Sequence, residues 1–185
     1  FRRTGAFMSS LVIVESPNKI SKLKKILGSD YVVMASVGHF TELSKKQMGI
    51  DTTTWKGDYQ ISDGKKDVVK KLQEEAKNHD NIYIASDPDQ EGEKIAFDLK
   101  EIMPKKGKNI YRIKFNEITK SAVLNAVKNP SIFDEKVLAS QQTRRFMDRI
   151  CGFKISPILW SKGLKNTSAG RVQSVVLRWL VERER

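Results

Sequence analysis

The first 133 residues alternate between short apolar runs and segments in which an apolar residue recurs at every third or fourth position. The short runs predict strands, because a strand buried on both faces carries consecutive apolar side chains. They lie at 11–14, 31–36, 81–85 and 110–115. The periodic segments predict amphipathic helices at 17–27, 65–77, 91–103 and 119–128. Strands that alternate with helices are typical of the α/β class, in which helices cover both faces of a mostly parallel sheet.

Two stretches depart from this alternation. Residues 41–64 hold three glycines and three consecutive threonines without a sustained period, which predicts a long surface excursion. After Pro130 the strands stop, and the pattern predicts an all-helical segment with helices at 134–150 and 170–183. We therefore expect one domain at 9–133 and the start of a second at 134–185. Residues 1–8, which are basic and end in Met8, are interpreted as a tag remnant and the natural start.

Charge points to a polyanionic partner. The chain has 34 Lys and Arg against 22 Asp and Glu, a net charge of +12, and such an excess attracts nucleic acid. Residues 134–185 hold 11 basic and 5 acidic side chains, half of that excess. Charge alone leaves open a merely soluble basic surface. Apolar runs of four residues argue against a membrane span, and the single cysteine, Cys151, suggests a reducing, cytoplasmic compartment.

Four carboxylates occupy alternate positions after the strand predicted at 81–85, in the segment Ser-Asp-Pro-Asp-Gln-Glu-Gly-Glu. In an extended chain, this spacing turns Asp87 and Asp89 to one side, and Glu91 joins them as a helix begins. Converging carboxylates repel one another unless a cation neutralises them. A hard divalent ion such as Mg²⁺, bound through oxygen, is the expected cofactor.

Two simpler interpretations match part of the acidic segment. Acidic residues favour the first turn of any helix, although four of them exceed what a helix start needs. The spacing also matches the opening positions of an EF-hand calcium loop. That loop does not fit, because a strand precedes the segment, Pro88 interrupts it, and its final position holds Asp98 instead of Glu.

A second chemical segment, Glu15-Ser-Pro-Asn-Lys19, stands where the first strand gives way to the first helix. Glu15 is a candidate general acid or base, since neighbouring acids and exclusion of water raise a carboxyl pKa. Lys19 would add positive charge to a helix start that already suits a phosphate. Taken alone, a capped helix with one Glu and one Lys is usually only structural.

Considered together, these segments resemble a known family. Six motifs stand in the order found in type IA DNA topoisomerases, over residues 11–185. They are Leu-Val-Ile-Val-Glu-Ser-Pro-x-Lys at 11–19, Ser-Val-Gly-His at 36–39, Ser-Asp-x-Asp-x-Glu-Gly-Glu at 86–93, Phe-Asn-Glu-Ile-Thr at 115–119, Gln-x-Arg-Arg-Phe-Met-Asp-Arg at 142–149 and Ser-Ala-Gly-Arg-Val-Gln-Ser at 168–174. The resemblance implies a Rossmann-like Toprim fold for 9–133 and a helical single-strand-binding domain from 134.

The resemblance also implies roles for single residues. Near the metal, Glu15 matches the family's acid/base glutamate, Lys19 its active-site lysine and Arg112 a basic residue close by, while Asp87, Asp89 and Glu91 match the Mg²⁺ triad. The implied DNA-binding residues are His39, Arg144, Arg145, Asp148, Ser168, Arg171 and Gln173. A lone histidine after a strand is, however, more often an ordinary hydrogen-bonded side chain.

The implied activity is ATP-independent relaxation of negatively supercoiled DNA through a transient phosphotyrosine link to a single-stranded segment. We expect a monomer in the cytoplasm or nucleoid, with no nucleotide cofactor and no membrane partner. Two departures matter. Gln90 replaces the arginine usual in the acidic motif, and none of the tyrosines matches the family's nucleophile, so we expect the chain to bind metal and DNA without cleaving.

Two other functions stay open on sequence. A primase-like or recombination-mediator Toprim protein, acting as a metal- and DNA-binding module, would explain the acidic segment. It would not explain the motifs at 142–149 and 168–174. A phosphate-binding α/β domain centred on Lys19 lacks the glycine-rich loop that such sites need.

Overall fold

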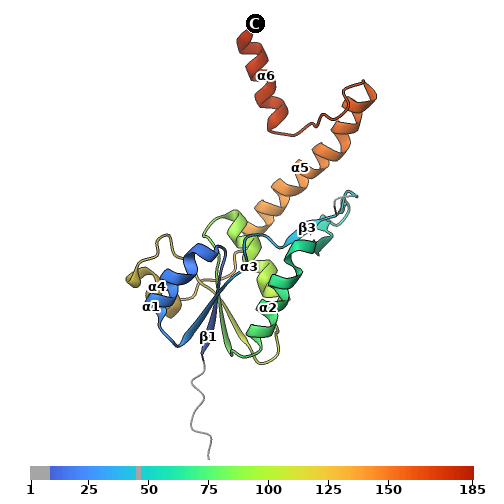
Figure 1. Cartoon of the computed structure of the whole chain (residues 1–185). Coiled ribbons are helices and arrows are strands. Elements are labelled where there is room, and N and C mark those ends of the chain that lie inside the picture. The colour runs from blue at the N-terminus through green and yellow to red at the C-terminus, as the bar shows by residue number, and fades with distance from the viewer. Residues whose placement is uncertain (1–8, 45–46) are drawn as a thin grey trace, which may run out of the picture. The chain divides into compact units, whose positions relative to one another are not determined.

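The computed structural model describes residues 9–44 and 47–185, and its centre is a parallel four-stranded sheet (Figure 1). The strand order is β2-β1-β7-β8, and neighbouring strands are parallel throughout. These strands span Ser10–Val14 (β1), Tyr31–Ala35 (β2), Asn81–Ala85 (β7) and Asn109–Arg112 (β8). The predicted strands are confirmed, except that the last ends at Arg112, where the chain had been expected to stay extended to 115. The predicted α/β fold is confirmed.

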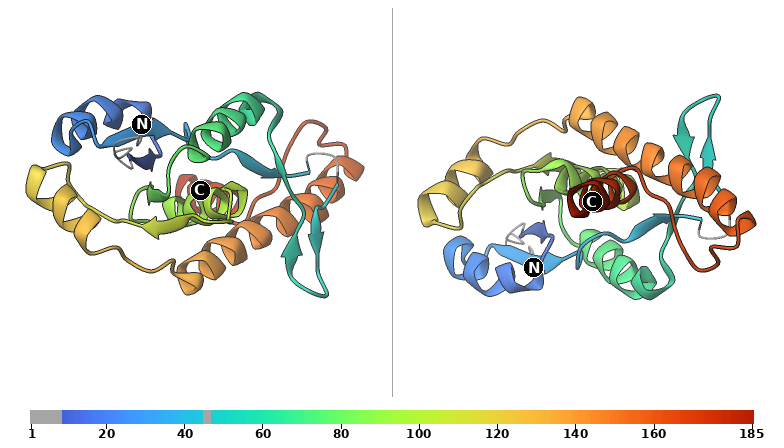
Figure 2. Two further views of the ribbon diagram at one scale, coloured as in Figure 1. Left: turned by 90° about the horizontal axis from the view of Figure 1, so that it is seen from below. Right: turned by 90° about the horizontal axis from the view of Figure 1, so that it is seen from above.

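Helices cover both faces of this sheet (Figure 2). Helices α1 (Ile20–Leu27) and α4 (Lys120–Lys128) pack on one face, and α2 (Lys66–Ala76) and α3 (Gln90–Ile102) pack on the other. The apolar residues of β1 alternate between these two cores, and all four side chains from Leu11 to Val14 are fully buried. This double burial explains why β1 is apolar at successive positions.

Local signals in the sequence set the helix ends. Ser16 caps the short 3-10 turn Pro17–Lys19 by accepting a hydrogen bond from the Asn18 amide, and α1 follows it directly. Gly28 ends α1 with a φ of 79°, a conformation that costs glycine nothing. Thr119 caps α4 and Asp89 caps α3. A second 3-10 turn, Asp63–Lys65, leads into α2. Strands β1 and β7 therefore pass into helical segments within a few residues.

The predicted excursion at 41–64 contains short regular structure. Strands β3 (Thr41–Leu43) and β6 (Tyr59–Ile61) pair with each other, and β4 (Ile50–Asp51) pairs antiparallel with β5 (Lys56–Gly57). Strands of two or three residues are too short to produce a hydrophobic period, so the sequence pattern did not predict them.

The chain divides into two compact units. Unit 1 consists of residues 1–42 and 61–138, and unit 2 of residues 43–60 and 139–185. In unit 2, Leu43 and Ile50 form a small core with Phe146, so the excursion groups with the later helices. The domain boundary predicted near Phe133 stays a prediction, and the predicted tag remnant at 1–8 lies outside the described residues.

Helix α5 (Glu135–Ser161) is longer than the pattern predicted, and α6 (Gln173–Glu184) follows it. The prediction that the helix starting at 134 ends at 150 is wrong, because α5 continues through Pro157. A proline removes one backbone donor and usually kinks or ends a helix, but it does not forbid continuation. No described helix is both long and apolar enough to cross a bilayer.

Candidate metal centre and candidate nucleic-acid interface

The carboxyl edge of the sheet gathers the predicted chemical groups of unit 1. Glu15 follows β1, and the acidic segment follows β7, its neighbour in the sheet. The turn after β2 is tied to β1, because the Ser36 amide donates to the Val14 carbonyl at 2.9 Å and the Gly38 amide donates to the Glu15 carbonyl at 3.1 Å. Parallel strands thus deliver separate segments of sequence to one edge.

The turn at 36–39 has an unusual backbone. Val37 has a φ of 59°, which is strained for a β-branched residue, and Gly38 follows with a φ of 76°. Lys65 holds this turn by donating from Nζ to the Val37 carbonyl at 2.7 Å. The strained turn places His39 next to the acidic segment.

Each carboxylate of the predicted metal triad contacts a donor of the protein itself. Asp87 pairs with the Lys19 ammonium. Glu91 Oε2 lies 2.8 Å from His39 Nε2. Asp89 Oδ1 accepts the Gly92 amide at 2.6 Å and caps α3. Within 9–44 and 47–185, no three acidic, histidine or cysteine side chains are arranged to hold a metal ion.

The donor chemistry nevertheless suits a hard divalent ion. Asp87 and Glu91 keep 42% and 50% of their side chains exposed, so a hydrated cation can reach both. Carboxylate oxygens on neighbouring turns are the ligands that such an ion takes together with retained water. The residues present fit the metal, but their carboxylates are turned toward protein donors.

A groove of about 430 Å³ opens beside this segment. It brings together Lys19, Asp87 and Asp89, whereas Glu15, His39 and Glu91 are not among its lining residues. Its other wall is the motif at 115–118, including the exposed side chains of Asn116 and Glu117. Sequence reasoning gave that motif no role, although its position after the last strand of the sheet was a signal. Glu15 as a whole residue is half-buried.

Gly92 allows the tight passage from the strand into α3. A Cβ at this position would lie 2.0 Å from the Asp87 carbonyl oxygen, closer than any real contact. Ser86 reinforces the turn by donating from its hydroxyl to the Gly92 carbonyl at 2.6 Å. The acidic segment therefore depends on glycine for close backbone approach and not for a special φ.

Arg112 lies beneath the acidic segment and is fully buried. Its guanidinium donates to four backbone carbonyls, at distances between 2.8 and 3.2 Å; they belong to Ile84, Ser86, Asp87 and Ile113. Burial lowers the pKa of this guanidinium, while the nearby Glu93 carboxylate opposes the shift. Arg112 thus fixes the backbone that carries Asp87 and does not itself face the groove.

Glu93 completes this buried frame and was not among the predicted site residues. Only 1% of it is exposed, and its carboxylate lies 3.4 Å from Arg112 Nε and 2.9 Å from Lys114 Nζ. It also accepts the Asp134 amide at 2.9 Å. The alternating acidic pattern contained Glu93, but only the helix phase separates this inward carboxylate from its outward neighbours.

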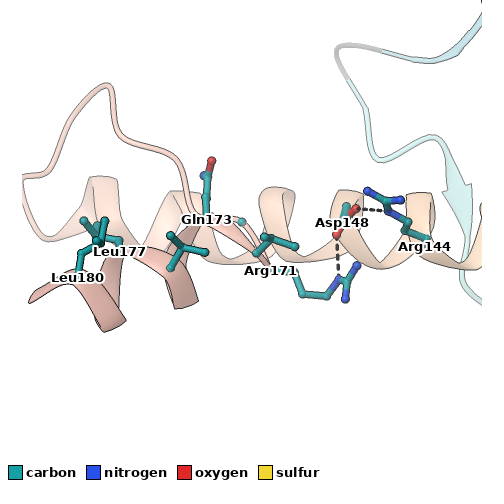
Figure 3. A pocket seen from close by; sticks show the side chains of 9 residues that line it. Arg144, Asp148, Arg171, Gln173, Leu177 and Leu180 are labelled. Carbon is teal, nitrogen blue, oxygen red and sulfur yellow. Dashed lines mark hydrogen bonds and ion pairs between the residues drawn. The ribbon is translucent and has the colours of Figure 1, made fainter. Parts of the chain in front are cut away.

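Of the predicted nucleic-acid residues, Arg144, Arg171 and Gln173 line one groove of unit 2 with Asp148 (Figure 3), whereas His39 lies in unit 1. Arg171 Nε donates to Asp148 Oδ1 at 2.9 Å, and Arg144 lies 4.0 Å from the other carboxylate oxygen. These three residues line a groove of about 610 Å³ together with α6 side chains such as Leu177. One carboxylate therefore positions two guanidinium groups at the same groove.

The other predicted contacts divide into two kinds. Gln173 lines the groove and donates to the backbone and hydroxyl oxygens of Ser168, at 3.0 and 3.2 Å. Arg145 instead lies over the Tyr59 ring, 6.0 Å from its centroid. Ser168 lines a second, more apolar groove of about 430 Å³ with Phe153 and Trp160. Sequence reasoning assigned Trp160 no role, and its place in α5 gave no signal.

Comparisons with known proteins agree with this architecture. The Toprim domain model matches residues 10–118, and a DNA topoisomerase model matches residues 133–185. The full-length topoisomerase I of Thermotoga maritima superimposes with a TM-score of 0.83 at 41% sequence identity. That match covers 94% of this chain and 30% of the Thermotoga chain.

Proposed function

The chain belongs to the Toprim family and corresponds to the N-terminal part of a type IA DNA topoisomerase, and we propose its function from this premise. We propose that the chain supplies the metal centre and part of the strand-binding groove of an enzyme that relaxes negatively supercoiled DNA without ATP. Toprim domains bind divalent metal, and the proposed ion here is Mg²⁺. The observation that carries the proposal is the groove in which Lys19 faces Asp87 and Asp89 at the carboxyl edge of the sheet.

Each group of unit 1 has a proposed task. Mg²⁺ at Asp87, Asp89 and Glu91 would neutralise charge on a phosphodiester during religation. Lys19 and His39 would donate to phosphate oxygens, and Glu15 would move a proton to or from the sugar oxygen. Arg112 acts through the backbone of the acidic segment, so we propose that it is a positioning residue and not one that touches DNA.

Unit 2 is proposed to bind the single-stranded segment. It holds 13 Lys and Arg against 5 Asp and Glu, which gives a field that attracts phosphate. Arg144, Arg171, Gln173 and Ser168 offer donors, and Asp148 holds the two guanidinium groups at the same groove. We propose that the strand lies along this groove and that the domain change falls near Phe133.

None of the four tyrosines is placed to act as the nucleophile in the acidic groove. Tyr83 stacks on Tyr111 at 5.2 Å within the sheet, and burial raises the pKa of its hydroxyl. A raised pKa makes the phenol a poorer nucleophile at neutral pH. The strand-cleaving tyrosine is therefore proposed to come from another part of the enzyme.

The test combines binding with cleavage. Fluorescence anisotropy with a labelled oligonucleotide should show salt-dependent binding that favours single-stranded over duplex DNA. Incubation with supercoiled plasmid and Mg²⁺ should give neither relaxation nor a detergent-stable protein–DNA adduct. Robust relaxation by this chain would contradict the assignment of the nucleophile, and equal binding of duplex and single strands would contradict the assignment of unit 2.

The alternative is a Toprim protein of the primase-like or recombination-mediator kind. The topoisomerase match over residues 133–185 does not favour it. Single-strand binding that persists unchanged in an Arg144→Ala, Arg171→Ala double variant would revive it, because such a protein would not need this groove.

A further inference from the structure

The three acidic side chains of the proposed metal centre are not free in this structure. Lys19 neutralises Asp87, His39 contacts Glu91, and the Gly92 amide occupies one oxygen of Asp89. We propose that Lys19 and His39 are internal partners of the acidic site, which a divalent ion displaces, and that their release readies both of them for a substrate phosphate. This inference rests on the proposed metal-binding function.

Electrostatics makes such an exchange favourable. Asp87 and Glu91 stand four positions apart in the acidic segment, and while no metal is bound Asp87 pairs with the Lys19 ammonium and Glu91 with the His39 ring. A divalent ion brings twice the charge of an ammonium and binds several carboxylates at once. It therefore competes successfully for the same oxygens while the displaced groups gain hydration.

The contacts of Lys19 and His39 with the acidic segment are solvent-accessible, whereas the Arg112–Glu93 pair beneath the segment is buried. Side chains of Lys19 and His39 are 26% and 32% exposed, so water can replace their carboxylate partners. Arg112 and Glu93 are 0% and 1% exposed, so separating them would break a buried ion pair that water cannot replace. Exchange is thus confined to the exposed layer of the site.

Both displaced groups have a place to act. Lys19 already lines the groove beside Asp89 and the motif at 115–118. The ring of His39 keeps Nδ1 buried without a hydrogen-bond partner among the described residues, so Nε2 is its working atom. Once Glu91 binds metal, this nitrogen can turn to a phosphate oxygen. Metal and phosphate would then bind cooperatively, each favouring the other.

The first experiment is calorimetric titration of Mg²⁺ into the chain and a Lys19→Met variant. Removing the competing ammonium should tighten Mg²⁺ binding by about tenfold, since a like charge within contact distance opposes the ion even after solvent screening. Lys22→Met is the matched control, because Lys22 is an exposed lysine of α1 that pairs with no carboxylate among the described residues. It should change the affinity by less than about twofold.

Equal or weaker Mg²⁺ binding by Lys19→Met would overturn the inference. If the parent chain binds no Mg²⁺ at all, the failure belongs to the proposed metal centre itself. The two failures are therefore distinguishable in one set of titrations.

The second experiment follows the two histidines by NMR during the same titration at constant pH. The ring signals of His39 should move with the calorimetric midpoint as Glu91 passes to the metal. His79 is the internal control, because its ring is tied to Glu75 and to the Ser9 carbonyl, at 2.8 and 2.7 Å. A stationary His39 ring in the presence of calorimetric binding would contradict displacement.

Discussion

Arginine plays opposite parts in the two units of this chain. In unit 1, Arg112 is fully buried; its guanidinium donates hydrogen bonds to backbone carbonyls and forms an ion pair with Glu93. In unit 2, Arg144 and Arg171 keep 63% and 43% of their side chains exposed and share the carboxylate of Asp148. The difference shows that a guanidinium close to a groove can either hold the surrounding backbone in place or bind a ligand in the groove. A buried guanidinium has the first role and an exposed one is available for the second.

The two units differ in burial in the same way as their arginines. The acidic edge of unit 1 lies on a sheet in which the β1 side chains from Leu11 to Val14 are fully buried, so we expect its exposed groups to exchange partners without loss of the fold. Helix α6 of unit 2 has no buried residue, and Trp179 and Leu177 are exposed. The groove side chains of unit 2 therefore lie partly on an exposed helix, whereas the acidic edge of unit 1 lies on a buried sheet.

The largest expected effect comes from breaking the buried frame. Arg112→Met should lower the free energy of unfolding by about 3–5 kcal/mol, because it breaks the buried ion pair with Glu93 and removes the donor of four backbone carbonyls. Urea denaturation followed by circular dichroism measures this. Arg144→Met is the matched control in unit 2 and should cost less than about 1 kcal/mol, as expected for an exposed pair. Similar losses in both variants would erase the contrast between the two arginines.

A smaller effect separates metal binding from stability within unit 1. Asp89→Asn removes a carboxylate charge but keeps a residue that caps helices as well as aspartate does. Mg²⁺ affinity should fall by about tenfold or more, while the midpoint of thermal unfolding without metal should hardly move. Calorimetry and thermal unfolding check the two halves. Unchanged Mg²⁺ affinity would exclude Asp89 from the metal centre.

The working arginines of unit 2 should affect salt dependence more than stability. Arg171→Ala should weaken single-strand binding and reduce the slope of log affinity against log salt by about one unit. Arg178, an exposed arginine of α6 paired with Glu182, is not among the residues of the groove and serves as the control. Anisotropy titrations over a range of salt decide between them. A slope that responds equally to both variants would mean diffuse attraction without a defined groove.

The smallest effect concerns the turn between β4 and β5. Hydrogen bonds from Thr54 and Thr53 lower the pKa of the Asp51 carboxyl. The folded-state pKa of Asp51 therefore lies below its unfolded-state pKa. The stability that these hydrogen bonds contribute is fully present above the unfolded-state pKa and is lost as the pH falls through the folded-state pKa. Thr54→Val should move the Asp51 pKa back up, which NMR titration can follow. An Asp51 that titrates identically in parent and variant would show that the turn hydrogen bonds are not populated in solution.

Sequence patterns predicted much of the sheet because their signals are local. Consecutive apolar residues marked β1, Ser16 and Gly28 marked the ends of the first helical segment, and the acidic segment was expected at a strand end, where the structure has it. Helix α5 was predicted too short, because proline usually ends a helix and Pro157 does not. Strands of two residues near Ile50 left no period to detect.

The candidate site was predictable in composition but not in arrangement. The acidic motif suggested converging carboxylates, whereas the structure pairs Asp87 with Lys19 and Glu91 with His39, residues 68 and 52 positions away in the chain. The buried partnership of Glu93 with Arg112 likewise joins different elements. Such long-range pairs depend on strand order, which no local pattern contains.

The most direct test of the acidic edge as a divalent-metal centre uses Mn²⁺ in place of Mg²⁺, since both prefer oxygen ligands and Mn²⁺ broadens NMR signals of nearby nuclei. Substoichiometric Mn²⁺ should broaden the amide signals of residues 86, 87 and 89–91 first, together with those of the groove wall at 116 and 117, and excess Mg²⁺ should restore them. The amide of His79 should stay sharp. Broadening that is absent from 86–91, or equally strong around exposed acidic residues such as Asp51 and Glu182, would contradict the account.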